Sequence, residues 1–215
     1  MIIKNSAFEI PIYKTNLVNH KEIKHKFTEE ILPRLQNLPG PNNIGLNLYS
    51  DYFPGLDRLD SKWKNFYSQL SSQFLKKAGF NQNKEWTVDI DLWYNVGFKG
   101  SFQEEHDHMG GFPGCQYSAI HFLIYDPREH EPTRFYNPIH HTFLRNMHPC
   151  NGEDMPIDWQ TPHYVPQIQE GDVLIFPSYL KHSVPYQKSD KLRATIALNF
   201  TIGNTSEFLF KNTVS

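Results

Sequence analysis

Apolar residues near the amino terminus are spaced as they would be on one face of a helix. Four of them recur every four residues: Ile23, Phe27, Ile31 and Leu35. This repeat predicts an amphipathic helix with that face buried. Asn19 and Glu22 have the spacing of a helix capping box, which predicts where the helix begins. Pro33 has no backbone N–H and should kink or end the helix early.

A second helix is predicted to begin at Asp60 and to end at Gly79, because glycine suits a carboxyl-terminal cap. Its buried side is predicted from the apolar residues in between: Trp63, Phe66, Tyr67, Leu70 and Phe74. No internal repeat or low-complexity tract interrupts the pattern before or after these two segments.

From about residue 86 the repeat changes to two, which predicts an extended strand. Apolar residues would point to one side of it: Val88, Ile90, Leu92, Tyr94 and Val96. The alternate residues would point to the other side: Asp89, Asp91, Trp93 and Asn95. Further strands are predicted at residues 7–17, 117–125 and 193–202 and at the VLIFP segment after Asp172, whereas residues 139–165 look irregular.

Two helices followed by many strands favour an α+β fold that is mainly β, with the helices packed against a β-sandwich or jelly roll. The high aromatic content (16 Phe, 11 Tyr and 4 Trp) and the 15 prolines suit strands joined by well-defined loops. A chain of 215 residues most simply forms one domain, which we assign to residues 1–215.

Charge and composition narrow the classes of partner. The net charge is −2 and no basic block stands out, so nucleic acid is not expected as a partner. No apolar run is long enough for a membrane helix, and the amino terminus lacks a secretory signal pattern. Cys115 and Cys150 give no disulfide framework and are expected as free thiols. A soluble cytoplasmic protein is therefore expected.

Three histidines form a candidate metal site. His106 and His108 lie two residues apart and would share one face of a strand, and His182 could return from a neighbouring strand. Imidazole suits iron, zinc, copper and nickel, so ligand type alone does not select the metal. Glu104 shares the face of the histidines, and Asp107 could reach the metal if the strand is irregular, so either carboxylate is an alternative ligand. Uninvolved histidines are a competing interpretation in a chain with 11 of them.

Arg193 and Thr195 would share a strand face near the candidate metal site. A guanidinium can bind a carboxylate through two parallel hydrogen bonds, and a threonine hydroxyl can add a third. A surface arginine in a salt bridge is the simpler alternative. His121 lies within an apolar strand, where a hydrogen-bonded core histidine is the first interpretation and lining of a substrate pocket is the second. Seven histidines carry no comparable support: His20, His25, His130, His140, His141, His148 and His163.

Four segments in this order resemble the small 2-oxoglutarate–iron(II) oxygenase-like proteins of bacteria and their phages. The segments are LWYNVGFKGSFQEEHDH, YSAIHFLIYDP, GDVLIFPSYLKHSVP and RATIALNF. The last two are the specific part, and Thr195 stands where the family pattern has serine. Met109 stands where the pattern has proline after the second histidine. The resemblance spans roughly residues 7–202 and makes a phage-encoded protein one expected source.

The resemblance implies a double-stranded β-helix, a cupin-like jelly roll with flanking amino-terminal helices. It implies Fe(II) and 2-oxoglutarate as cofactors and a dioxygenase that hydroxylates an unidentified substrate, releasing succinate and CO2. Carried over by position, the metal ligands would be His106, His108 and His182, and Arg193, Thr195 and Asn95 would bind 2-oxoglutarate. Trp93 and His121 are the candidate substrate-pocket residues.

Two other functions fit parts of the pattern. The first is a three-histidine cupin-type metalloenzyme that does not use 2-oxoglutarate. The second is a non-enzymatic jelly-roll binding module. Most 2-oxoglutarate oxygenases use two histidines and one carboxylate, so a histidine at position 108 is the feature that keeps the first alternative open. The substrate, small-molecule or peptidyl, and the oligomeric state are not legible from the residues.

Overall fold

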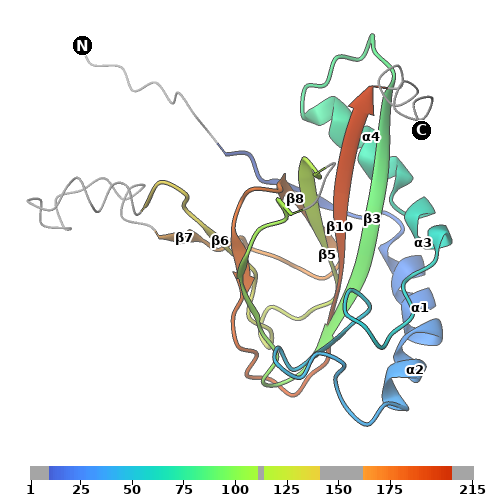
Figure 1. Ribbon diagram of the computed structural model, residues 1–215, viewed down its shortest axis with the longest axis vertical. Coiled ribbons are helices and arrows are strands. Elements are labelled where there is room, and N and C mark those ends of the chain that lie inside the picture. Colours follow the sequence, from blue (N-terminus) through green and yellow to red (C-terminus); the bar gives the residue numbers. More distant parts are fainter. Residues whose placement is uncertain (1–9, 111–113, 141–161, 205–215) are drawn as a thin grey trace, which may run out of the picture.

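Two antiparallel sheets and a layer of helices make up the fold (Figure 1). The structure is a computed structural model that describes residues 10–110, 114–140 and 162–204. The helices are α1 (His20–Glu30), α2 (Leu32–Gln36), α3 (Ser61–Asn65) and α4 (Ser68–Lys77). The strands are β1 (Tyr13–Asn16), β2 (Leu48–Ser50), β3 (Trp86–Gly97), β4 (Gln103–His106), β5 (Tyr117–Ile124), β6 (Arg134–Tyr136), β7 (His163–Tyr164), β8 (Asp172–Pro177), β9 (His182–Val184) and β10 (Arg193–Asn204).

The larger sheet has the strand order β1-β8-β5-β10-β3-β2, and the smaller one has the order β4-β9-β6-β7. In Figure 1 the helices cover one face of the larger sheet, and the smaller sheet lies on its other side. Neighbours in each sheet are far apart in the chain, which is typical of a jelly roll. The predicted fold, mainly β with a double-stranded β-helix and amino-terminal helices, is confirmed.

β10 lies between β3 and β5 in the larger sheet. One of its faces points to the apolar core beneath the helices, and the other points to the space between the two sheets. Its pairing with β3 sets Thr195 opposite Asn95 and Ala197 opposite Trp93. Partners of this kind place their side chains on the same face of a sheet. The alternate residues of both strands, which include Tyr94 and Ile196, join the core beneath the helices. The predicted alternation along β3 is therefore confirmed.

The first predicted helix is confirmed in its buried face but not in its cap. Ile23 and Phe27 are fully buried, and the helix is interrupted at Ile31, two residues before Pro33. The Asn19 side chain makes no capping hydrogen bond, and its Nδ2 donates instead to the carbonyl of Phe66 (3.1 Å). The helix therefore begins where predicted, with Asn19 at the N-cap position, but the side-chain cap does not form because a tertiary contact takes the amide.

The second predicted helix forms as two consecutive helices, α3 and α4, with a break at Phe66 and Tyr67. Asp60 caps α3 by accepting a hydrogen bond from the backbone N–H of Lys62 (2.9 Å). Gly79 follows α4 with a φ of +85°, a conformation that favours glycine. Both predicted ends are confirmed.

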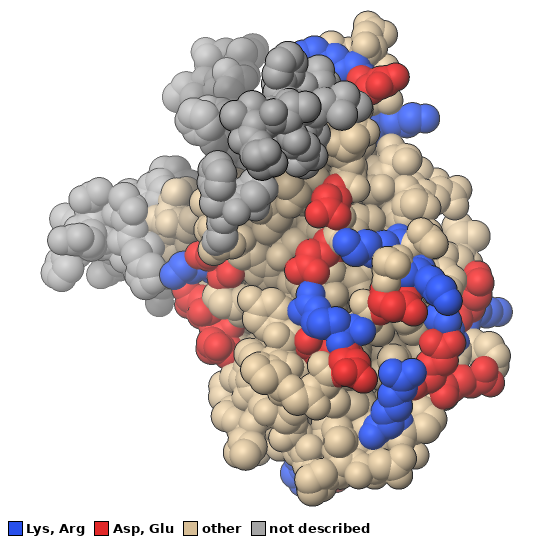
Figure 2. Space-filling view, turned by 45° about the vertical axis from the view of Figure 1, so that its right-hand side comes forward, with Lys and Arg blue, Asp and Glu red and all other residues tan. Residues whose placement is uncertain are grey.

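Charges of both signs alternate over the molecular face in Figure 2. Ion pairs between surface side chains are frequent in the described residues, such as Lys26 with Glu30 (2.6 Å) and Arg58 with Asp91 (2.7 Å). This face presents no single-sign patch. No helix within the described ranges has the length and apolar character needed to span a bilayer. Most of the irregular stretch predicted at residues 139–165 lies outside the described residues, as does Cys150.

Candidate active site

The three candidate histidines converge between the two sheets. His106 ends β4 and pairs directly with His182, the first residue of β9. His108 follows β4 instead of lying on it, yet its ring reaches the same place. One ligand atom from each of these three rings lies within 4.8 Å of those of the other two. The structure thus brings together the predicted metal-binding set, which is the arrangement that a metal ion requires.

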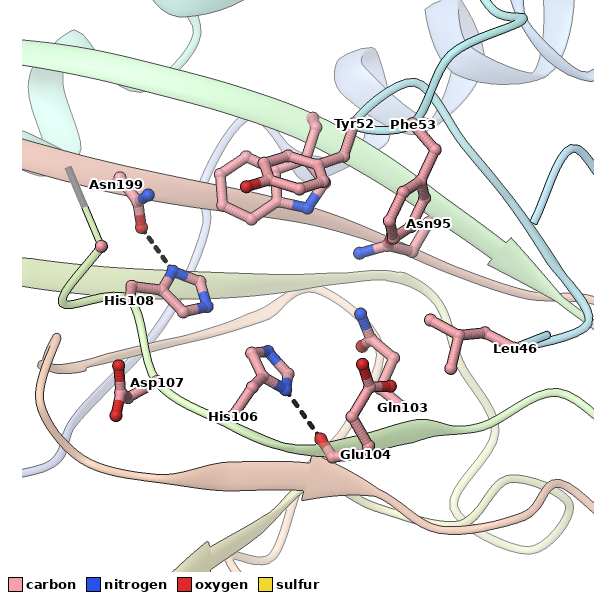
Figure 3. Close-up of a pocket in the computed structure, with 12 residues that line it drawn as sticks. Leu46, Tyr52, Phe53, Asn95, Gln103, Glu104, His106, Asp107, His108 and Asn199 are labelled. Atoms are coloured by element: carbon pink, nitrogen blue, oxygen red, sulfur yellow. Dashed lines mark hydrogen bonds between the residues drawn. The ribbon is translucent and has the colours of Figure 1, made fainter.

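A hydrogen bond from Nδ1 orients each of the three rings, and Figure 3 shows those of His106 and His108. Each Nδ1 donates to an oxygen: His106 to the Glu104 carbonyl (2.7 Å), His182 to the Leu180 carbonyl (3.1 Å) and His108 to Asn199 Oδ1 (2.6 Å). A ring that carries its proton on Nδ1 keeps the lone pair on Nε2 for another partner. The three rings are therefore prepared to bind through Nε2.

Burial favours the neutral form of two of these rings, His108 and His182. Burial holds the pKa of His182 well below its ordinary value, and the neighbouring His106 and His108 lower it further. Burial also lowers the pKa of His108, although the hydrogen bond with Asn199 acts in the opposite direction. A neutral imidazole is the form that binds a metal.

The two carboxylates considered as alternative ligands stand beside the histidines. Asp107 Oδ1 accepts a hydrogen bond from the backbone N–H of Met109 (3.0 Å). Glu104 and Asp107 both line the cavity, but the cluster of potential metal ligands in the described residues contains the histidines alone. The geometry thus favours three imidazoles over a mixed set.

Arg193 lies on the inner face of β10 with only 6% of its surface exposed. Its guanidinium carbon sits 5.8 Å from the ring centre of Phe122 and 6.0 Å from that of Tyr125. Within the described structure its Nε and Nη2 have no hydrogen-bond partner. Burial lowers the pKa of Arg193 to about 10, so the group is still charged at neutral pH. A buried, unpaired cation is costly, which points to an anion as its missing partner.

A cavity of about 310 Å³ lies in front of the histidines. Trp93 and Asn95 line it, as predicted, together with Tyr52 and Phe53 from the loop after β2, which the sequence did not single out. Asn95 and Gln103 also line the small space next to Arg193. These two amides therefore lie between the cavity and the guanidinium.

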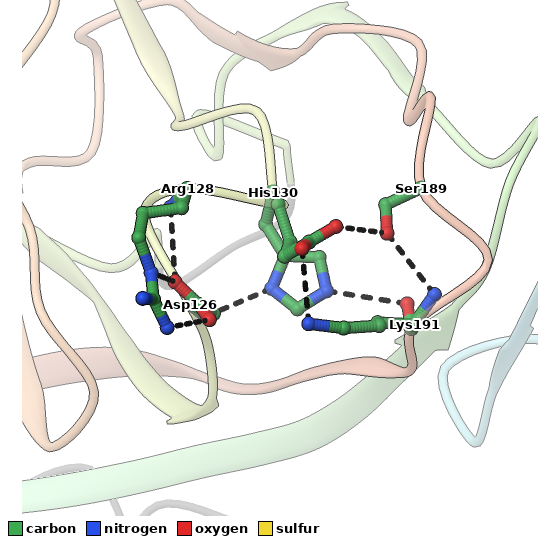
Figure 4. A network of polar contacts seen from close by, with 6 residues as sticks. Asp126, Arg128, His130, Ser189 and Lys191 are labelled. Carbon is green, nitrogen blue, oxygen red and sulfur yellow. Dashed lines mark hydrogen bonds and ion pairs between the residues drawn. The ribbon is translucent and has the colours of Figure 1, made fainter.

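A polar network around His130 includes residues of the turn after β5 and of the segment before β10 (Figure 4). His130 Nδ1 accepts from the backbone N–H of Asp126 (3.0 Å), and Nε2 donates to the carbonyl of Lys191 (3.2 Å). The Tyr125 hydroxyl donates to the His130 carbonyl (3.2 Å). The network thereby ties the turn after β5 to the segment that enters β10, two residues before Arg193.

His121 does not line the pocket, so that prediction was wrong. It lies on the helix-facing side of β5 and is fully buried. Its Nδ1 contacts the Tyr67 hydroxyl (2.9 Å) and its Nε2 contacts His20 Nδ1 (3.0 Å). The reason is the alternation of side chains along β5. Its neighbours Ile120 and Phe122 point to the opposite face, into a second apolar cluster, so His121 points toward the helices. The first interpretation, a hydrogen-bonded core histidine, agrees with these contacts.

Asn199 was not predicted as a site residue. It shares the inner face of β10 with Arg193 and Thr195, so the two-residue repeat in RATIALNF was the available signal. Tyr52 and Phe53 carried no such signal, because they reach the cavity from a loop.

Comparison with protein families gives one match. The sequence model of the family described as "Putative 2OG-Fe(II) oxygenase" matches residues 91–199, just over half of the chain. The chain belongs to the 2-oxoglutarate–Fe(II) oxygenase family. The protein is thus an oxygenase that uses Fe(II) and 2-oxoglutarate, and the matched segment contains the three histidines together with Arg193. No curated protein matches the chain significantly.

Solved structures of similar fold are related to this oxygenase at low sequence identity. A Pseudomonas putida prolyl-4-hydroxylase has 12% identity and a TM-score of 0.55, with 89% of this chain and 92% of that one covered. HygX from Streptomyces hygroscopicus, with nickel and 2-oxoglutarate bound, has 14% identity and a TM-score of 0.51, with 89% and 82% covered. A viral collagen prolyl hydroxylase from Paramecium Bursaria Chlorella virus-1 has 11% identity and a TM-score of 0.50, with 88% and 94% covered. These likenesses establish the shared fold.

The residues present in this oxygenase fit both cofactors. Three Nε2 lone pairs suit a transition metal, and they leave room for other ligands on an ion that prefers six. A buried guanidinium with unused N–H groups suits the carboxylate of a 2-oxo acid. The fit thus rests on donors and acceptors that otherwise lack partners.

Proposed function

We propose that His106, His108 and His182 bind Fe(II) through Nε2, and that Arg193 binds the distal carboxylate of 2-oxoglutarate. Thr195 and Asn95 lie on the same inner surface, where a hydroxyl and an amide would complete the carboxylate site. The observation that carries the proposal is the buried guanidinium, whose Nε and Nη2 have no partner in the described residues. A binding module or a three-histidine enzyme without 2-oxoglutarate would need a different acid as the partner of that cation.

The reaction proposed is hydroxylation: a substrate C–H becomes C–OH while O2 is consumed and 2-oxoglutarate is oxidised to succinate and CO2. Bound Fe(II) would supply the activation of oxygen. The chain itself supplies neutral imidazoles of fixed orientation and a fixed cation for the co-substrate. Phe122 and Tyr125 beside Arg193 exclude water, which strengthens the attraction between the guanidinium and a carboxylate.

The substrate would enter the cavity lined by Tyr52, Phe53 and Trp93. Tyr52 is 57% exposed at the rim, so the cavity is open to solvent on that side. An open rim of this kind is compatible with a small molecule or with one residue of a peptide. Trp93 packs next to His108 (5.6 Å between ring centres) and is the residue that would bring a substrate close to the metal.

Anaerobic titration tests the proposal. Apoprotein mixed with Fe(II) and 2-oxoglutarate together should develop a weak visible charge-transfer band, because the 2-oxo acid chelates the metal. Neither component alone should give the band. A band that forms without 2-oxoglutarate, or no band at all, would contradict the proposed site.

The role of Arg193 has a separate test. Arg193→Gln should raise the KM for 2-oxoglutarate by about a hundredfold, because a buried charge loses its partner. The charge-transfer band should still form at saturating 2-oxoglutarate. Arg34→Gln, which removes an exposed arginine of α2, is the matched control and should leave the KM unchanged. An equal KM in both variants would rule out the anchoring role.

A further inference from the structure

The ring of His108 is held differently from the other two rings of the metal cluster. His106 and His182 donate to carbonyls only two residues earlier in the chain. His108 donates to the side chain of Asn199, which is 91 residues away in sequence and lies on β10. Local geometry therefore orients two of the rings, whereas a remote amide orients the third.

A chain of small polar side chains fixes the amide of Asn199. Ser118 Oγ donates to Asn199 Oδ1 (2.9 Å), so this oxygen accepts from a hydroxyl and from the His108 ring at once. Ser118 in turn contacts Ser178 (3.0 Å), and Cys115 Sγ donates to Ser178 Oγ (3.1 Å). Two donors on one oxygen set the direction of the amide, because the NH2 group could not satisfy either of them.

The same residues also hold the backbone of His108. Its N–H donates to the carbonyl of Ser178 (2.9 Å), and Cys115 Sγ lies 3.3 Å from its carbonyl oxygen. This support is needed because His108 lies beyond the end of β4, where no strand ladder fixes it. Ring and backbone are thus anchored to one cluster, in which Ser118 and Ser178 are buried and Cys115 and Asn199 are half-buried.

We propose that Asn199 is the positioning residue that lets His108 serve as a metal ligand. By accepting from Nδ1 it selects the tautomer with the lone pair on Nε2 and fixes the ring plane. Non-haem iron sites commonly have a carboxylate as one of three ligands, and a carboxylate can bind through either oxygen. An imidazole has one usable nitrogen, so it binds well only when its ring is held in place. The inference rests on the ligand role of His108 given under the proposed function.

Cobalt(II) binding to the full-length apoprotein tests this inference without reference to activity. Asn199→Leu, of similar size but without an acceptor, should weaken Co(II) affinity by about 10- to 100-fold. Asn199→Asp keeps the acceptor and should bind Co(II) at least as tightly as the wild type. Ser118→Ala removes the support behind the amide and should weaken affinity by less than about tenfold. Thr201→Val, on the same strand two residues further on, is the control and should bind like the wild type.

The visible spectrum of bound Co(II) separates positioning from stability. Asn199→Leu should change the spectrum because a loosened ligand alters the coordination, while Asn199→Asp should preserve the three-histidine signature. Thermal unfolding of each apoprotein reports fold damage. If Asn199→Leu does not fold, the Co(II) affinities of Asn199→Asp and Ser118→Ala decide whether Asn199 positions His108. Wild-type affinity and spectrum in Asn199→Leu, or equal losses in Asn199→Leu and Asn199→Asp, would overturn the inference.

His108→Ala distinguishes this inference from the proposed function. Loss of Co(II) affinity in His108→Ala but not in Asn199→Leu would leave the ligand set intact and remove the role of Asn199. Unchanged affinity in His108→Ala would remove His108 from the ligand set, and both proposals about it would fail together.

Discussion

Two histidine clusters lie on opposite sides of the larger sheet, and they differ in what their ring nitrogens contact. On the inner side, His106 and His182 of the smaller sheet and His108 after β4 donate through Nδ1, and one ligand atom of each ring lies within 4.8 Å of the others. On the helix-covered face, both ring nitrogens of His121 are occupied by Tyr67 and His20. His121 is as deeply buried as any ligand of the inner cluster. Ring lone pairs without a partner among the described residues, and not burial, therefore distinguish the metal site from the structural cluster.

Removing one ring from each cluster should give the largest contrast. His182→Ala should abolish metal binding and 2-oxoglutarate oxidation, because one of three ligands is lost. His20→Ala, at the edge of the other cluster, should retain both. Co(II) titration and succinate release are the measurements. Metal binding that survives in His182→Ala, or is lost in His20→Ala, would break the comparison.

His121→Leu should damage the fold and spare the chemistry. The substitution leaves the buried Tyr67 hydroxyl without its partner and should lower the free energy of unfolding by about 1–3 kcal/mol. Denaturant unfolding of the apoprotein measures this loss. Co(II) affinity should match that of the wild type, and a marked decrease would show that the two faces are coupled.

The helix-face cluster should also make stability depend on pH. Burial lowers the pKa of His121 from 6.5 to about 3, and burial lowers that of His20 although Glu170 partly opposes the shift. The unfolded chain therefore binds more protons below pH 6.5, so stability is fully present above that pH and declines as pH falls toward 3. Each histidine contributes a slope of at most about 1.4 kcal/mol per pH unit. The decline on acidification should be shallower in apo His121→Leu than in the wild type, and equal slopes would contradict the assignment.

The smallest effect is expected at the carboxylates beside the inner cluster. Asp107→Asn and Glu104→Gln each remove a charge near the metal but no ligand, so Co(II) affinity should change by less than about tenfold. Glu105→Gln, which breaks an exposed ion pair with Lys181, is the control. A loss of Co(II) affinity in Asp107→Asn as large as that in His182→Ala would identify a carboxylate ligand and contradict the set of three imidazoles.

Repeats in the sequence predicted those parts of the fold that local spacing determines. The buried face of α1, the alternation along β3 and the cap at Gly79 follow from such spacing. The cap at Asn19 failed because Phe66, 47 residues away, takes its amide. The break between α3 and α4 also had no signal, since no proline or glycine marks Phe66 and Tyr67.

The candidate site was predictable where one strand or turn carries several of its residues. His106 with His108 and Arg193 with Thr195 each stand two residues apart, and that spacing was the clue. His121 was assigned to the pocket because the face on which β5 presents it depends on pairing with β10. Asn199 was missed because the two-residue repeat places it on the inner face without indicating its partner, His108, which lies beyond the end of β4 and 91 residues away.

Both faces of β10 are in use between Arg193 and Phe200, so its length is constrained. Every second side chain borders the reaction chamber, and those in between hold the helical layer in place. Insertion of a single amino acid there would exchange the side chains of the two strand faces. A guanidinium would then enter the apolar core, and a leucine would face the cofactors. New substrate preferences in this lineage should therefore arise in the loops around the chamber, such as the one that carries Tyr52 and Phe53, while β10 keeps its length.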